Sequence, residues 1–293
     1  MRNISIIKWG SNRYNDSYWY GSVLSIDDVR AHFSSPLMPI GGSIKTWHSF
    51  NAYSRSRASP MLPLLVRNNS YSVSLFLEEN DANHFQVTVA FYDKFKHEIG
   101  TEYFDDLRFS FTYPPDAVNY EINLINKKHD SLIFYFMLIT EVSRDEESRY
   151  EMSRNQAFSV LKSKQKRSSQ TEDALEIAIH YLVRETSILS LSDAYPDTLQ
   201  FFVTKEEKSF LEVSVALIQM IKKTDGGISL VQGINFAQLP NFYHLLPSIL
   251  RTLLPDNQLT TTLVRDDEVQ SEREVRKYVS VISQMLNRET TKI

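Results

Sequence analysis

The first half of the chain consists of short stretches in which apolar and polar residues alternate. In one of them, Tyr71, Val73 and Leu75 share one side while Ser72 and Ser74 share the other. A period of two residues indicates a β-strand with one buried face. Strands repeated at short intervals are typical of an antiparallel β-sandwich or jelly roll. The predicted strands are residues 5–9, 19–26, 43–52, 71–77, 85–92, 102–111, 120–125 and 132–139.

The pattern changes after about residue 150, where stretches with helical spacing alternate with short apolar runs. Phe210, Val213, Leu217 and Ile221 recur at the spacing of one helix face. Strands that alternate with helices are typical of an α/β layer with parallel strands. We therefore predict strands and helices in turn, with a break at Pro247 because proline cannot donate a backbone hydrogen bond. The helices are 172–185, 209–224, 240–254 and 271–285, and the strands are 199–204, 228–232 and 259–264.

A charged, serine-rich segment lies between the two patterns. Residues 162–173 contain no apolar side chain, which is typical of a solvated linker. The length of 293 residues also exceeds that of most single domains. The sequence therefore predicts a multidomain α+β protein. It has an N-terminal antiparallel β-sandwich at 1–150, a linker at 151–173 and a small α/β domain at 174–293.

The composition of the chain argues against some classes of protein function. The formal net charge of −4 argues against a protein built to coat nucleic acid. One basic cluster lacks the neighbouring aromatic residues of a stacking platform and is better read as a solvated tether. No apolar run approaches the length of a membrane span, and the absence of cysteine suits a reducing compartment, so we expect a cytoplasmic protein. The basic cluster is Lys162, Lys164, Lys166 and Arg167.

The tract 41–65 combines strand residues with polar and aromatic groups that a structural strand does not need. Sugar sites on β-sandwiches pair aromatic faces with hydrogen-bonding side chains. Two alternatives stay open, because Trp47 also suits a core and Arg57 also suits a turn. A second aromatic cluster at 18–20 is predicted to meet either a glycan or a partner protein, where Tyr and Trp are enriched. The candidate ligand-binding residues are Trp47, Asn51, Tyr53, Arg57, Trp19 and Tyr20.

The sequence offers little for an enzyme. It lacks a nucleophile elbow, a phosphate-binding loop, a dinucleotide fingerprint and a zinc-binding helix. Its seven histidines show no metal-ligand spacing, so no catalytic residue, metal ligand or cofactor is predicted. An enzyme remains the weaker hypothesis. Its site would lie at the carboxyl ends of the C-terminal strands, near 232–235 and 265–267.

Several unusual elements occur in the order found in one bacterial family. The first half resembles the third accessory secretory protein of the accessory Sec system over roughly residues 4–140. The C-terminal half shows no such motif. The elements are IKWG near the start, Gly42-Ser43-Ile44 with Trp47, Asn51 with Tyr53 and Arg57, Pro60 before Leu62 to Leu65, and Phe91-Tyr92-Asp93.

The resemblance implies a non-catalytic subunit with a fold like that of carbohydrate-binding modules. Such a subunit assembles in the cytosol with two sister accessory secretory proteins. It helps the accessory SecA motor to export a serine-rich repeat adhesin that is glycosylated before export. The resemblance therefore implies a cytoplasmic protein, peripheral at the membrane through the translocon complex, with no transmembrane segment, cofactor or nucleic acid. A free-standing glycan-binding module is the alternative.

Overall fold

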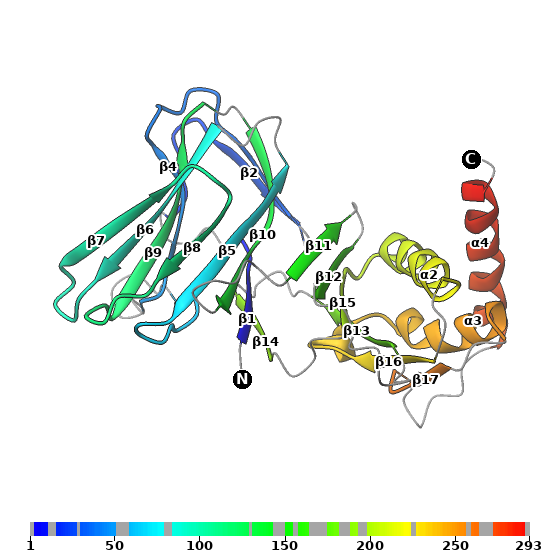
Figure 1. Cartoon of the computed structure of the whole chain (residues 1–293). Helices are drawn as coiled ribbons and strands as arrows, with labels where there is room; N and C mark the ends of the chain where they lie inside the picture. The colour runs from blue at the N-terminus through cyan, green and yellow to red at the C-terminus, as the bar shows by residue number, and fades with distance from the viewer. Residues whose placement is uncertain are drawn as a thin grey trace. The chain divides into compact units, whose positions relative to one another are not determined.

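The computed structural model divides the chain into two compact units, each described here by itself (Figure 1). The first comprises Met1–Ser148 and Arg184–Ala194, and the second comprises Arg149–Val183 and Tyr195–Ile293. The first unit therefore contains a segment that lies well beyond the predicted boundary at residue 150. The structure describes residues 3–10, 16–27, 30–50, 59–78, 84–128, 131–142, 150–154, 158–163, 175–181, 188–192, 198–223, 227–255, 259–263 and 272–290.

The described part of the first unit forms two antiparallel sheets. The larger has seven strands in the order β14-β1-β10-β3-β2, with β5 paired to β10 and to β8. The smaller has four strands in the order β4-β9-β6-β7. The larger sheet contains β1 (Asn3–Ile7), β2 (Val23–Ile26), β3 (Ala31–Ser34), β5 (Ser70–Glu78), β8 (Arg108–Thr112), β10 (Ser131–Val142) and β14 (Ile188–Ser192), and the smaller contains β4 (Ser43–His48), β6 (Phe85–Tyr92), β7 (Glu98–Phe104) and β9 (Asn119–Asn126).

The inward faces of both sheets contribute to one core. Alternate residues of β6, namely Val87, Val89 and Phe91, are buried in it, as the period of two predicts. An aromatic cluster occupies its interior, where the Trp9 ring meets Trp47 and Phe134 edge-on at centroid distances of 6.1 and 5.5 Å. Edge-to-face pairs of this kind add to the free energy gained by burying the rings.

The strand pattern departs from the prediction in several places: β3 was not predicted, and β1 and β4 differ in their bounds from the predicted 5–9 and 43–52. Gly21, at φ 64°, lies in a turn, so the predicted strand 19–26 is formed only by β2. The predicted strand 102–111 divides into β7 and β8 around the acidic bend that begins at Asp105. Ser72 and Ser74, predicted on a solvated face of β5, are both buried. The larger sheet is therefore covered on both faces at β5.

The second unit combines a six-stranded mixed sheet with helices. Its order is β11-β12-β15-β13-β16-β17; β11, β12 and β15 are antiparallel neighbours, whereas β13 is parallel to β15 and β16, and β16 to β17. The strands are β11 (Tyr150–Arg154), β12 (Ser159–Ser163), β13 (Leu175–Tyr181), β15 (Leu199–Val203), β16 (Ile228–Gln232) and β17 (Leu259–Thr261). The helices are α2 (Glu207–Ile221), α3 (Leu246–Leu253) and α4 (Glu272–Thr290), with the 3-10 turns η2 (Phe236–Gln238) and η3 (Asn241–Leu245).

Two predictions for this half are wrong. The predicted helix 172–185 is the strand β13, because Ile177, Ile179 and Tyr181 alternate with Ala178 and His180 in a strand buried on both faces. The predicted linker 151–173 includes most of β11 and all of β12, while 164–174 lies outside the described residues. The strands β11 and β12 are short and contain few alternating apolar residues, so the sequence alone does not distinguish them from a linker.

The helical run 241–253 changes from η3, which ends at Leu245, to α3, which begins at Leu246, so Pro247 lies in the first turn of α3 and does not break the run itself. Proline is tolerated there because the first turn of a helix has no acceptor for its backbone N–H groups. None of the helices in the described ranges has the length and apolar character needed to cross a membrane.

Candidate binding face

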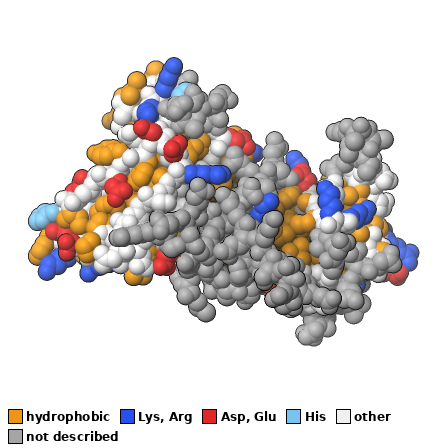
Figure 2. Space-filling view, in the orientation of Figure 1, with side chains coloured by type: hydrophobic (Ala, Val, Ile, Leu, Met, Phe, Trp, Pro, Cys, Tyr) orange, Lys and Arg blue, Asp and Glu red, His pale blue; other side chains and the backbone are white. Residues whose placement is uncertain are grey.

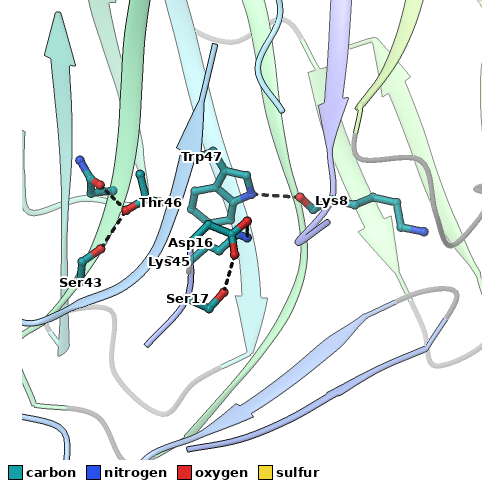
Figure 3. A network of polar contacts seen from close by, with 8 residues as sticks. Lys8, Asp16, Ser17, Ser43, Lys45, Thr46 and Trp47 are labelled. Atoms are coloured by element: carbon teal, nitrogen blue, oxygen red, sulfur yellow. Dashed lines mark hydrogen bonds and ion pairs between the residues drawn. The ribbon is translucent and has the colours of Figure 1, made fainter. Parts of the chain in front are cut away.

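Trp47, the central residue of the predicted ligand tract, lies in the core of the first unit. It is 0% exposed, and its indole Nε1 donates a hydrogen bond of 3.0 Å to the Lys8 backbone carbonyl (Figure 3). The prediction that Trp47 presents its face to a ligand is therefore wrong, and the alternative of a core residue holds. Asn51, Tyr53 and Arg57 lie outside the described residues.

Beside Trp47, the core contains an ion pair that the sequence did not reveal. Lys45 Nζ lies 2.6 Å from Asp16 Oδ2, and the two side chains are 0% and 4% exposed (Figure 3). Within the described ranges, neither of these two atoms has a further hydrogen-bond partner. Burial lowers the pKa of Lys45 to about 8, although the Asp16 carboxylate opposes this shift. The pair is costly to bury and sits where a sandwich normally places apolar side chains.

Backbone pairing holds this ion pair in place. The segment around Asp16 lies along the free edge of β4, where Thr46 N donates to Asp16 O at 2.7 Å and Tyr18 N to Ile44 O at 3.0 Å. The 28 residues between the two partners in the sequence include a whole hairpin, β2–β3. The only sequence signal was a lysine on the core side of a strand that also carries Ile44 and Trp47.

The opposite face of the four-stranded sheet is polar. Thr46 Oγ1 donates to Asn123 Oδ1 at 2.6 Å, and Asn123 Nδ2 donates to Thr88 Oγ1 at 3.2 Å, so three strands share one hydrogen-bonded row. On the fourth strand, Tyr103 pairs with Thr88 and is 67% exposed. Ser43 adds a contact of 3.2 Å to Thr46 at the other end of the row. We call this surface of β4, β9, β6 and β7 the outer face.

A second row crosses the outer face nearer to the end of β6. The Tyr92 hydroxyl donates to Glu121 Oε2 at 3.0 Å. Burial, together with the carboxylate, raises the pKa of Tyr92 to about 12, and burial raises the pKa of Glu121 above its ordinary value. His48 pairs with Glu121 across the strands, stacks on Phe50 at 4.4 Å and has a pKa lowered by burial. This row therefore holds a neutral phenol and a neutral imidazole at ordinary pH.

The outer face combines the groups that recognise sugars and polar polypeptides. Tyr103 offers an exposed ring on β7, while Asn123 and Glu121 offer amide and carboxylate groups on β9, with β6 between the two strands. The sequence prediction missed every one of these residues, because it followed unusual residue clusters. The signal was the polar half of the strand alternation, such as Thr46 and His48 on either side of Trp47.

Trp19 and Tyr20 form part of an exposed apolar patch at one end of the first unit. Trp19 is 46% and Tyr20 84% exposed, in the turn that leads to β2. Ser22 Oγ in this turn lies 3.1 Å from Ser35 Oγ, next to the loop that carries Leu37 and Ile40, which are 86% and 79% exposed. Exposed aromatic and aliphatic groups gathered in this way are typical of protein contacts. We call these four apolar residues the turn patch.

The position proposed for an enzyme site in the second unit is filled by structural contacts. The His180 imidazole accepts a hydrogen bond from Ile234 N at its Nδ1, at 2.9 Å, and its Nε2 bonds the Gln200 carboxamide oxygen. A Cβ on Gly233 would lie 2.5 Å from that Nδ1 and from the Ile179 carbonyl oxygen. The loop 233–235 thus closes directly onto β13. The other predicted segment, 265–267, lies outside the described residues, and the described ranges hold no cluster of three potential metal ligands.

Comparison with known proteins gives a consistent family. Residues 17–141 match the family model described as "Accessory Sec secretory system ASP3". The accessory Sec system protein ASP3 of Streptococcus gordonii is 30% identical over 145 residues, which cover 48% of this chain and 88% of that protein. The protein of the same name from Staphylococcus aureus (strain NCTC 8325 / PS 47) is 29% identical over 138 residues. That match covers 47% of this chain and 43% of the Staphylococcus aureus protein, less than half of its length.

A solved structure shares the fold of nearly the whole chain. It is the Glycosylation Associate Protein (Gap123) complex from Streptococcus agalactiae, with a TM-score of 0.53 and 18% identity. The likeness covers 95% of this chain and 87% of that chain. At this identity it concerns the fold alone.

Proposed function

Because the chain belongs to the ASP3 family of the accessory Sec secretory system, we propose that it is a non-catalytic subunit of that system. In this proposal it assembles in the cytoplasm with two sister accessory secretory proteins. It assists the accessory SecA motor in exporting a glycosylated serine-rich repeat adhesin. Family membership over the first unit is the observation that carries the proposal. This chain shares its fold with a chain of the Gap123 complex, and that likeness supports the proposal of assembly with sister proteins.

The two surfaces of the first unit suit two roles in this system. The turn patch presents uncharged aromatic and aliphatic groups, which favours a protein partner. The outer face presents the Tyr103 ring on β7 together with hydrogen-bonding amide and carboxylate groups on β9, which favours the glycan or the polar polypeptide of the adhesin. The proposal therefore assigns sister proteins to the turn patch and the adhesin to the outer face.

Co-expression tests the assembly. We expect the full chain to co-purify with its two sister proteins from the same genome, and the variant Tyr20→Asp with Leu37→Asp to lose them, because each carboxylate would be desolvated at the contact. The control, Tyr103→Asp, places one carboxylate on the outer face instead and should keep the complex. Separate elution of the unmodified chain from both sisters would contradict the assignment to this system.

Binding of a serine-rich peptide, with and without a monosaccharide on one serine, tests the outer face. We expect Tyr103→Ala to weaken binding about fivefold, because ring contacts contribute about 1 kcal/mol. Asn123→Ala should weaken it further by removing a donor and an acceptor. The measurement is calorimetry on the full chain, and Tyr20→Ala is the control. Equal affinities for all three variants and the parent would exclude this face.

The same experiment separates the runner-up function. A free-standing glycan-binding module would bind the glycosylated peptide through the outer face yet elute alone from the co-expression test. The polar outer face with its exposed Tyr103 is the observation that supports this alternative function.

A further inference from the structure

The end of the first unit opposite the turn patch carries a different kind of surface. The strand register places Asn126 and Gly42 at one end of the four-stranded sheet and Tyr92 at the other. At that second end, β6 and β7 are joined by residues 93–97, of which Lys94, Phe95, Lys96 and His97 have exposed side chains. Figure 2 shows hydrophobic, basic and histidine side chains gathered at this end of the unit.

The tip that carries these side chains is rigidly built. Asp93 Oδ1 accepts hydrogen bonds from Phe95 N at 2.7 Å and from His97 N at 2.9 Å, and Asp93 N donates to His97 O at 3.0 Å. Lys96 adopts the left-handed region at φ 68° to close the turn. Phe95 is held 66% exposed, with the Lys94 ammonium 4.9 Å from its ring centre. The turn thus presents one aromatic ring close to the Lys94 ammonium, with Lys96 next to it in the sequence.

Two neighbouring loops extend the same surface. Val118 N donates to Tyr92 O at 2.8 Å, and Arg67 Nε donates to Ala117 O at 3.0 Å, which ties three loops together. They add exposed apolar side chains at Leu64 (90%), Val66 (60%) and Val118 (42%). We call the surface of Leu64, Val66, Arg67, Lys94, Phe95, Lys96 and Val118 the hairpin end.

We propose that the hairpin end docks directly on the surface of an anionic lipid bilayer. Apolar tips flanked by cations match the boundary between acyl chains and anionic headgroups, where apolar burial and charge attraction add. Lysine stems can follow the ring into this layer while their ammonium groups stay at the headgroups. A protein partner fits less well, because the centres of protein interfaces are depleted in lysine and here two lysines flank the central ring.

Three carboxylates, those of Asp93, Glu98 and Asp116, also lie at this end. Asp93 is used inside the turn, and Glu98 Oε1 accepts a hydrogen bond from Thr101 Oγ1 at 2.6 Å. Asp116 is exposed, and the hairpin end carries the three cations Arg67, Lys94 and Lys96. Docking at this end leaves the turn patch, at the opposite end of the sheet, free for sister proteins. The inference goes beyond the proposed function, because lipid contact needs neither the sisters nor the adhesin.

Sedimentation of the full chain with vesicles tests this inference. We expect binding to phosphatidylcholine vesicles only when phosphatidylglycerol is included, and weaker binding as salt is raised. Lys94→Glu with Lys96→Glu should weaken binding about tenfold or more, and Phe95→Ala about fivefold. The matched controls are Lys222→Glu with Lys223→Glu, an exposed pair on the second unit, and Leu37→Ala, both of which should bind like the parent.

A second measurement separates insertion from adsorption. Phe95→Trp in a Trp19→Phe background should give an indole emission that shifts to the blue and is quenched by brominated lipid. Absence of vesicle binding at low salt would overturn the inference. So would equal losses in the two lysine-pair variants, or a Phe95→Trp emission that vesicles leave unchanged. Because the co-expression test involves no lipid, the two proposals fail independently.

Discussion

Replacing Lys45 by alanine should lower the free energy of unfolding of the first unit by about 3–5 kcal/mol. The substitution removes the ion-pair partner of Asp16 and leaves its carboxylate buried without that cation. All three tryptophans of the chain, Trp9, Trp19 and Trp47, lie in the first unit. Urea unfolding followed by tryptophan fluorescence therefore reports on this unit alone.

The double variant Asp16→Leu with Lys45→Met measures the net contribution of the ion pair to stability, separately from the loss caused by removing one partner alone. We expect its stability to return to within about 1 kcal/mol of the parent or to exceed it, because apolar groups of similar volume replace two buried charges. A loss below about 1 kcal/mol in Lys45→Ala alone would show that water reaches Asp16 and that the pair is not buried in solution. A double variant as unstable as the single one would show that Asp16 has another role.

The pair also shows which part of the fold the sequence could predict. Strands came out well where alternation is local, as in 85–92 and 228–232, which coincide with β6 and β16. In these strands, the alternation alone predicts which side chains face the core. Asp16 and Lys45 lie 29 positions apart, and nothing local in the sequence joins them. Their contact exists only because the segment at Asp16 pairs with the edge of β4.

The outer face was out of reach for the same reason. Thr46 and Asn123 are 77 residues apart, and Asn123 and Thr88 are 35 apart, so their row depends on strand order and register. A shift of one residue in either pairing would turn these side chains into the core. Conspicuous clusters such as the tract around Trp47 drew the prediction instead. Large aromatic residues in a strand mark the core at least as often as a binding site.

The strand β13 illustrates a failure of the periodicity itself. Its buried residues satisfy a helical spacing and a strand alternation equally, because both faces are covered. Only the parallel neighbours β15 and β16 decide between the two. His180, in the middle of this strand, was expected at a surface or in a satisfied setting and is 4% exposed. Its environment leads to the second large prediction.

Acidification should destabilise the second unit through His180. Burial lowers its pKa to about 4, against an ordinary value near 6.5 in the unfolded chain. Between these values the unfolded state binds the proton and the folded state does not. The contribution to stability is therefore complete above pH 6.5 and is lost as the pH falls towards 4. Each pKa unit between the folded and unfolded states corresponds to about 1.36 kcal/mol, so the full loss in the free energy of unfolding is about 3 kcal/mol.

The helices described in the structure, α2, α3 and α4, all lie in the second unit, so helical circular dichroism in urea follows its unfolding. The variant His180→Asn keeps an acceptor for the Ile234 N–H but cannot titrate. Between pH 7 and 4.5, its free energy of unfolding should therefore fall by about 2–3 kcal/mol less than that of the parent. The exposed His97→Asn serves as control and should follow the parent. If His180→Asn folds poorly, the His180 imidazole resonances of the parent should show no titration above about pH 5. An imidazole that titrates near its ordinary value would mean that the contact between His180 and the loop at Gly233 is open in solution, because protonated Nδ1 cannot accept the Ile234 hydrogen bond.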